Sequence, residues 1–404
     1  MSEPAAAPPH RLFVAPVLVG MTLAQAVASS STLAFTAAST AIAAALALPT
    51  SWIGYQFSLV ALGAMSTSVL SGAAIARWGS VGTLQRALAG CAAGSLLMAV
   101  PHVAAIALGA LLTGLAYGFV NPAGNGLVAR IATERNRSLL FSIRQTGVPG
   151  GGVIAGLAAP PLALTLGWQA VPLAAAAICL ATALGLEARR RQWDDGRPDG
   201  GAGSGVWSAL TNVLRQPRLR ALVVLSMVFS SCQACVMSFA TPLLVKDGGL
   251  TLVAAGLVLS TMHFAGMFGR VLWGWVADRL RSGPLVLAGI AALATVCAVA
   301  VSTIGPGWSE TALHMLMLAF GVVALGWNGV LLAEVARASP PALVGANTGA
   351  VLLFTFSANV AMPTLFASVY ALFGGYAATF AAVAAVPLAG ALLALTLVRA
   401  DRRR

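Results

Sequence analysis

Long apolar runs separated by short polar loops repeat along the whole chain. A run of 18 or more apolar residues is long enough to cross a hydrocarbon core of about 30 Å as a helix. The pattern predicts an all-α membrane protein with about twelve transmembrane helices. The predicted spans are 13–34, 51–75, 84–101, 104–128, 138–163 and 168–187 in the first half, and 219–242, 253–277, 284–304, 311–334, 344–370 and 375–398 in the second.

One long polar stretch, from Glu187 to about Arg218, separates the two sets of spans. It holds three consecutive Arg, two consecutive Asp and a Gly-rich run, a composition typical of a flexible linker. The chain therefore divides into an N-terminal six-helix bundle (1–188), a cytoplasmic linker (189–218) and a C-terminal six-helix bundle (219–404). Within the linker, residues 207–214 are predicted to form a short amphipathic helix on the membrane surface.

The two halves of the chain repeat each other. Residues 54–80 align without gaps on residues 256–282, at a constant offset of 202. The identical pairs include Gly72 with Gly274, Arg77 with Arg279 and, at a second offset of 207, Asn121 with Asn328. Two parallel six-helix repeats are the plan of one large class of secondary transporters.

Composition and charge agree with a chain embedded in lipid. Hydrophobic residues make up 59% and charged residues 8%, whereas soluble domains carry about 25% charged residues. The net charge of +12 comes from Arg residues in short loops at alternate helix ends, while the loops on the other side hold Lys246 as their basic residue. This positive-inside pattern predicts that both termini are cytoplasmic. A nucleic-acid binder gathers its basic residues on a soluble face, so no nucleic-acid partner is expected. The richness in Arg and Ala suits a bacterium, which predicts the inner membrane.

The cysteines give no sign of a metal or redox centre. All five lie inside apolar runs and are interpreted as small helix fillers, although Cys232 and Cys235 form a C-x-x-C. Such a site needs further ligands nearby, so we expect no metal and no cofactor. The expected partners are the lipid bilayer and a small-molecule solute, with protons as a possible second cargo, and the protein is expected to be a monomer.

The loop after the second predicted helix of each half carries a recognisable motif. The second half has Gly274-Trp-Val-Ala-Asp278-Arg279, and the first half has Gly72-Ala-Ala-Ile-Ala76-Arg77. This G-x-x-x-D-R pattern resembles the major facilitator superfamily, and the resemblance extends over essentially the whole chain. It implies the twelve-helix fold of that family and a conformational latch formed by Gly72, Arg77, Gly274, Asp278 and Arg279. Ala76 replaces the acidic residue, which puts the latch of the first half in doubt.

The eighth predicted helix resembles one particular branch of this superfamily. Gly269-Arg270-x-x-x-Gly274-x-x-x-Asp278 looks like the pattern of the monocarboxylate and oxalate/formate branch, in which the Arg binds the substrate carboxylate. The eleventh predicted helix has no Lys or Arg, which disfavours a dicarboxylate held at both ends. The fourth has Ala110-Leu-Leu-Thr-Gly114 where proton-coupled drug exporters begin a basic motif, which disfavours a drug–proton antiporter.

Ionisable residues inside the membrane mark function because they are costly to bury. Arg270 lies about eight residues, roughly 12 Å, from the cytoplasmic end of its helix, and no Asp or Glu lies deep in any predicted span to neutralise it. Its guanidinium suits a carboxylate. The alternative is a structural Arg bonded to helix-end carbonyls.

Other polar residues complete the candidate site. His263 lies two turns before Arg270 on a similar face and is a candidate for substrate binding and proton coupling, or else a packing residue. Arg144 is predicted either to line the cavity or to extend toward the headgroups. Gln25, Gln233 and Asn359 are candidates for hydrogen bonds to substrate or between helices, and Asn121 and Asn328 are expected to join helices.

The sequence thus predicts a secondary active transporter that moves a small organic anion, a monocarboxylate in particular, by alternating access, as a proton symporter or an anion antiporter. The alternatives are a multidrug transporter, which should carry a deep acidic residue, and a neutral-solute transporter in which Arg270 is structural. An enzyme should show catalytic groups clustered at one depth, and this chain shows isolated ones. A receptor with the same site remains a further alternative.

Overall fold

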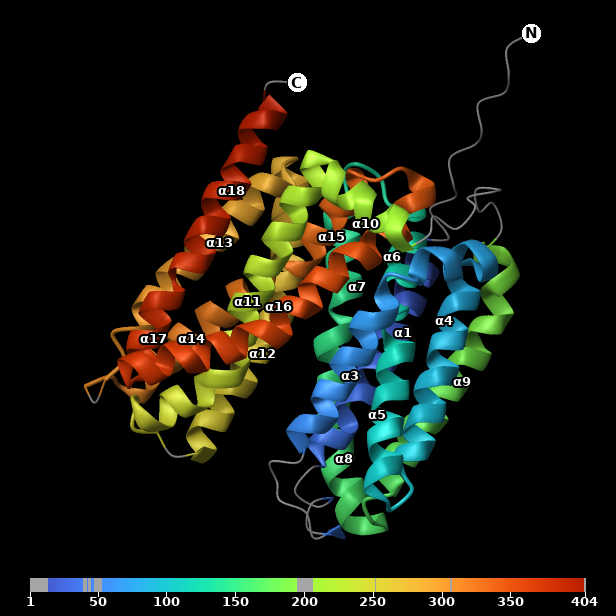
Figure 1. The fold of residues 1–404 in the computed structure, drawn as a ribbon, viewed down its shortest axis with the longest axis horizontal. Helices are drawn as coiled ribbons and strands as arrows, with labels where there is room; N and C mark the ends of the chain where they lie inside the picture. The colour runs from blue at the N-terminus through green and yellow to red at the C-terminus, as the bar shows by residue number, and fades with distance from the viewer. Residues whose placement is uncertain are drawn as a thin grey trace.

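The computed structural model describes residues 14–38, 42, 45–46, 53–194, 206–250, 252–305 and 307–402. Within these ranges the chain forms helices joined by short turns, and it contains no strand. Figure 1 shows two helical bundles, one from each half of the chain, lying side by side.

The helices follow the predicted spans in both halves. The N-terminal bundle contains α1 (Val14–Ala37), α3 (Ile53–Ser68), α4 (Ser71–Met98), α5 (Val103–Tyr117), α6 (Val120–Ile131), α7 (Arg137–Gln145), α8 (Gly147–Leu166) and α9 (Ala170–Asp194). The short α10 (Val206–Arg215) leads to the C-terminal bundle. That bundle contains α11 (Pro217–Lys246), α12 (Leu252–Leu280), α13 (Gly283–Val301), α14 (Glu310–Ala324), α15 (Asn328–Arg337), α16 (Val344–Phe373), α17 (Tyr376–Val383) and α18 (Ala385–Arg402).

Short breaks divide several crossings into two helices. Nine described segments are long and apolar enough to span a membrane, and four of them join two consecutive α-helices: α5 with α6, α7 with α8, α14 with α15, and α17 with α18. A fifth joins the 3-10 helix η3 (Pro341–Leu343) to α16. The second and third crossings lie in α3 and α4, because Gly79 has a non-helical backbone (φ 78°, ψ 170°) that divides α4. With α12 these make the twelve crossings of the predicted fold.

Small residues set how closely the helices of a bundle approach. Gly94 of α4 faces Gly109 of α5, and a Cβ built on either would lie 2.6 Å from the carbonyl oxygen of the other. In a lipid environment helix association depends on such close packing, because lipid tails are as apolar as the helices. The Gly-rich composition therefore produces tightly packed bundles.

The two bundles contact each other at one end of the molecule, which we call the α10 end because α10 lies there (Figure 1). At this end α7 lies against α12 and α15, and α16 lies against α3, α4 and α6. Toward the other end the bundles diverge (Figure 1). The charge pattern predicts that the α10 end faces the cytoplasm.

The start of the predicted linker belongs to the N-terminal bundle. Residues 189–194 continue α9, and Trp193 is buried beside Gly20. The Asp194 carboxylate accepts hydrogen bonds from the backbone N–H groups of Val81 (3.0 Å) and Gly82 (3.1 Å), in the first helical turn of α4 after the break at Gly79. The Gly-rich part of the linker lies outside the described residues, and the predicted helix at 207–214 is present as α10.

Candidate functional site

Arg270 lies on α12 at the junction of the two halves, with 4% of its surface exposed. Its Nε donates to the carbonyl oxygen of Leu325 at 2.9 Å, and its Nη1 donates to the carbonyl oxygen of Gln145. Leu325 directly follows α14 and Gln145 ends α7, so both carbonyls lie at helix C-terminal ends, where the helix dipole attracts a cation. In this conformation Arg270 makes the helix-end contacts of the structural alternative.

Arg144 is fully buried in the N-terminal bundle and does not extend to the surface. Its Nη1 donates to the side-chain oxygens of Asn121 (3.1 Å) and Asn125 (2.8 Å), and its Nη2 donates to Gln25 Oε1 and to the Val120 carbonyl, both at 3.0 Å. Four neutral acceptors thus replace water around this charge, as burial requires.

A chain of hydrogen bonds connects the two arginines. Gln145 accepts from Arg270 through its carbonyl oxygen and donates through Nε2 to Asn121 Oδ1 at 3.2 Å, the same oxygen that Arg144 contacts. Among the described residues no Asp or Glu forms an ion pair with either arginine. The centre of the protein therefore carries positive charge that only neutral dipoles balance.

Tyr117 is a polar residue at this centre that the sequence analysis missed. Its hydroxyl accepts from Gln25 Nε2 and shares a hydrogen bond with Ser29, both at 3.1 Å. It is only half-buried. The spacing of Tyr117, Asn121 and Asn125, four residues apart each time, places them on one helix face, and this pattern is the signal that could have revealed the cluster.

His263 is exposed, on the face of α12 that also carries Arg270. Seven residues correspond to about two helical turns, and the same face meets α7 further along, where Gly274 contacts Ser142. Its Nδ1 lies 2.9 Å from the Leu259 carbonyl oxygen, four residues earlier on the same helix. His263 thus shares a helix face with Arg270, and its second ring nitrogen has no hydrogen-bond partner among the described residues.

Gln233 and Asn359 join helices within the C-terminal bundle. Gln233 Oε1 accepts from Trp327 Nε1 (3.1 Å) and Asn328 Nδ2 (3.4 Å), and Asn359 Oδ1 accepts from Ser230 (2.7 Å). Both are half-buried, so their amide groups remain candidates for contact with a solute. Neither contacts Arg270 or Arg144 through these bonds.

Two joints, related by the internal repeat, connect the halves at the α10 end. In the first joint, α12 meets α7: a Cβ on Gly274 would lie 2.6 Å from Ser142 Cβ. In the second, α4 meets α16: a Cβ on Gly72 would lie 2.5 Å from Ala346 Cβ. Both joints therefore require a glycine where the helices cross.

Asp278 bridges the halves at the α12–α7 joint. Its carboxylate accepts from the backbone N–H groups of Ser138 (3.0 Å) and Leu139 (2.8 Å) in the first turn of α7. The partner of this latch residue is therefore a helix N-terminus, which attracts negative charge. Arg279 and Arg77 are exposed, and the guanidinium of Arg77 lies over the ring of Trp78.

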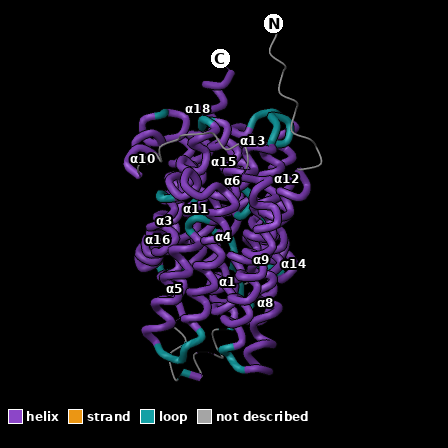
Figure 2. The backbone as a smooth tube through the Cα atoms, turned by 90° about the vertical axis from the view of Figure 1, so that its right-hand side faces the viewer, coloured by secondary structure: helices purple, strands orange, loops and turns teal. Residues whose placement is uncertain are grey.

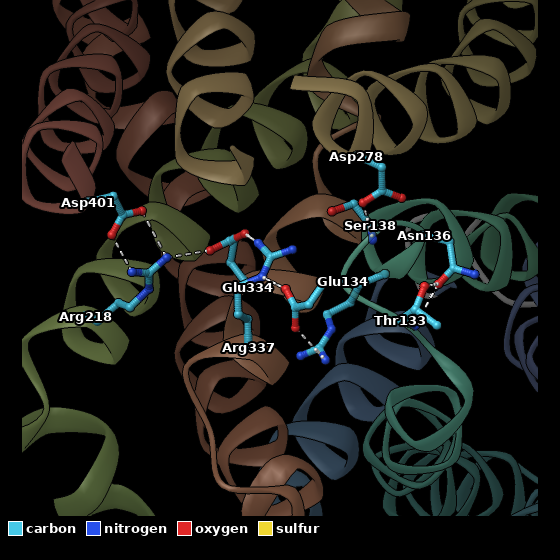
Figure 3. A network of polar contacts seen from close by, with 10 residues as sticks. Thr133, Glu134, Asn136, Ser138, Arg218, Asp278, Glu334, Arg337 and Asp401 are labelled. Carbon is cyan, nitrogen blue, oxygen red and sulfur yellow. Dashed lines mark hydrogen bonds and ion pairs between the residues drawn. The ribbon is translucent and has the colours of Figure 1, made fainter. Parts of the chain in front are cut away.

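A row of ion pairs continues from this joint across the α10 end (Figure 3). Glu134 contacts Arg337 across the halves at 3.3 Å, and Arg337 pairs with the buried Glu334. Glu334 also accepts from Arg218 at 2.9 Å, and Arg218 reaches Asp401 on α18. Among the described residues, no three His, Cys, Asp or Glu side chains gather as ligands for a metal ion.

Comparisons with known proteins agree with this architecture. The sequence model of the Major Facilitator Superfamily matches residues 20–363. A gallate transporter of Pseudomonas putida is 26% identical over 246 residues, which are 54% of this chain, so the chain spans about half (53%) of the length of this relative. The solved structure of the Escherichia coli fucose:proton symporter has a TM-score of 0.77 at 15% identity, covering 96% of this chain and 98% of that one. A human organic anion transporter has a TM-score of 0.73 at 19% identity, covering 96% and 100%.

Proposed function

The chain belongs to the major facilitator superfamily, whose matched members are transporters rather than enzymes, and on that premise we propose that it carries a small organic anion, a monocarboxylate, by secondary active transport. The observation that supports this substrate class is Arg270. It lies at the junction of the halves and is held by two carbonyl oxygens. A carboxylate is a stronger acceptor for a guanidinium than a neutral carbonyl.

The joints at the α10 end suggest how transport proceeds. In the described conformation the halves contact each other there, so a solute would enter from the opposite end. Opening of the α12–α7 joint would separate Arg270 from Gln145, because these two residues belong to different halves. A carboxylate bound to Arg270 would replace that lost partner and thereby favour the change of conformation.

His263 is the proposed proton-coupling residue. Its imidazole is exposed on the same face as Arg270, and its second ring nitrogen is free to exchange a proton. Histidine changes charge near neutral pH. Protonation would add a positive charge beside the anion, so uptake of the anion and the proton would support each other. We place the protein in a bacterial inner membrane with both termini cytoplasmic.

The matched transporters favour both an anion and a neutral solute. One relative is described as a gallate transporter and one structural neighbour as an organic anion transporter. The fucose:proton symporter shares the fold, and the carbonyl partners of Arg270 also suit a purely structural arginine. A neutral-solute transporter is therefore the second candidate.

Ligand-induced thermal stabilisation of the purified protein separates the two candidates. A ligand at 100 times its Kd stabilises the folded state by about 2.7 kcal/mol, so carboxylates should raise the melting temperature of the wild type. Arg270→Ala and Arg270→Lys should weaken carboxylate binding by about tenfold or more, because the bidentate guanidinium is lost. The control is Arg189→Ala, at an exposed arginine of α9.

Arg270→Lys keeps a positive charge at this buried position, so a loss of carboxylate binding in this variant does not come from removal of the charge and misfolding. Stabilisation by sugars or drugs alone, or an equal carboxylate response in all four proteins, would overturn the organic-anion proposal. Counterflow of the stabilising carboxylate in proteoliposomes then distinguishes a transporter from a receptor.

A further inference from the structure

The short helix α10 presents two opposite faces. Ala209 and Val213 are buried against the C-terminal bundle, where α10 contacts α11 and α16. Trp207 is 79% exposed and Leu214 is 42% exposed. At 100° per residue Trp207 and Leu214 share one side of the helix, and Ala209 and Val213 share the other. The outward side of α10 therefore carries Trp207 and Leu214, with the exposed Ser208 and Thr211 beside them, and no described part of the protein covers these apolar side chains.

The position of α10 identifies what this outward side meets. Figure 2 shows α10 at the edge of the molecule, beside the ends of neighbouring helices rather than stacked above them. Because the bundle spans a bilayer, this edge lies at the depth of the lipid headgroups. Trp is enriched at that depth, where its ring is part apolar and part polar.

The charges around α10 select the class of lipid. Arg215 at the end of α10 and Arg220 in the first turns of α11 are exposed. Exposed Arg beside an apolar helix face favours a surface that carries negative charge. We propose that α10 is a membrane anchor that binds anionic phospholipid headgroups through Arg215 and Arg220 while Trp207 and Leu214 insert among the acyl chains.

The same helix is connected to one of the two joints between the halves. Asn212 Nδ2 donates to Asn347 Oδ1 at 3.1 Å, and Asn347 Nδ2 donates to Ser339 at 2.9 Å. Asn347 is the neighbour of Ala346, which packs against Gly72. The helix α10 thus supports the first turn of α16, at the α4–α16 joint, where Ala76 leaves no carboxylate to bind that turn.

Anionic lipid therefore favours the conformation in which the α10 end is closed. When lipid holds α10 in the leaflet, the Asn212–Asn347 hydrogen bond keeps the first turn of α16 in the position that Gly72 requires. Asp278 acts across the two halves, whereas the anchor acts within the C-terminal half, by fixing the turn of α16 that packs against Gly72.

The depth of α10 is measured with a nitroxide label attached through Trp207→Cys. All five native cysteines are buried, so the introduced thiol is the accessible one. In vesicles of phosphatidylcholine with phosphatidylglycerol, the label should collide with oxygen, which dissolves in lipid, more often than with a water-soluble nickel complex. Arg215→Gln and Arg220→Gln should each raise, by about fivefold, the phosphatidylglycerol content at which the label at position 207 enters the lipid. Trp275→Cys, at an exposed Trp of α12, should be insensitive to the lipid charge.

Closure of the α10 end is measured as the distance between labels at Arg135→Cys and Leu280→Cys, which are exposed positions in different halves. Phosphatidylglycerol should increase the short-distance population severalfold. Asn212→Ala should abolish that increase while leaving the label at position 207 at the same depth. Neither experiment needs a substrate, so a failure of the organic-anion proposal does not affect them.

A label at position 207 that stays in water in both kinds of vesicle would overturn the anchor. If the distance distribution between positions 135 and 280 does not change with lipid charge, or changes equally in Asn212→Ala, the proposed connection between α10 and the joint is wrong.

Discussion

The two joints at the α10 end both place a glycine where two helices cross, and they differ in chemistry. Gly274 lets α12 cross α7, and Gly72 lets α4 cross α16 in the corresponding place of the other half. At the α12–α7 joint the carboxylate of Asp278 binds two N–H groups of α7. At the α4–α16 joint the equivalent residue is Ala76, and the residue before α16, Leu343, offers no side chain to its free N–H groups.

This difference separates two contributions to closure. Close backbone packing occurs in both joints, so it does not depend on the acidic residue of the motif. The charge of Asp278 adds stability to one joint alone, through the attraction between a carboxylate and a helix N-terminus. Three changes test this division, from the largest expected effect to the smallest.

Filling either glycine position should have the largest effect. Gly274→Val would place a Cβ within 2.6 Å of Ser142 Cβ, and Gly72→Val would place one 2.5 Å from Ala346 Cβ. Overpacking costs about 1–3 kcal/mol, so each variant should lower the closed population by about tenfold. The distance between labels at positions 135 and 280 measures this population.

The matched control is Gly289→Val on α13, where a Cβ meets nothing within 4 Å. We expect it to leave the distance distribution unchanged. Unequal effects of the two joint variants, with one of them silent, would show that only one joint holds the halves together.

Exchanging the acid between the joints should have an intermediate effect. Asp278→Ala should reduce closure by about fivefold, since such a cap contributes about 1 kcal/mol. Ala76→Asp should increase closure by a similar factor, because the repeat places this side chain beside the N–H groups of Gly345 and Ala346. The double variant should return close to the wild type, as measured by the same label pair. An Ala76→Asp variant that weakens closure would contradict the equivalence of the joints.

Removing the exposed ion pair should have the smallest effect. Glu134 is 72% exposed where it contacts Arg337, and exposed pairs contribute little. Glu134→Gln should therefore change closure by about twofold or less. That small change should disappear in about 1 M salt, where the Debye length is about 3 Å. A larger effect, or one that survives salt, would mean that this pair acts with the buried Glu334 rather than alone.

The parts of the candidate site differ in how far the sequence predicted them. Arg270 and Asp278 were found because a charge in an apolar run and a loop motif are visible in one dimension. The hydrogen-bond partners of these two residues were not predicted, because they are backbone carbonyl oxygens and N–H groups, which nearly every residue carries. Tyr117 and Asn125 were missed because neutral polar residues are common in apolar helices and gain meaning only beside Arg144.

The hydrophobic pattern and the internal repeat by themselves determined an all-helical membrane protein with two matching halves, because lipid forces every spanning segment to satisfy its own backbone. The positions of Gly72 and Gly274 along their helices followed from the same repeat, and the depth of Arg270 followed from its distance to the end of its apolar run. The tertiary structure decided which end of the molecule is closed, that two backbone carbonyls hold Arg270, and that α10 supports α16. These features depend on contacts between segments 55 to 135 residues apart, and no local pattern specifies which of two nearly equivalent ends brings such segments together.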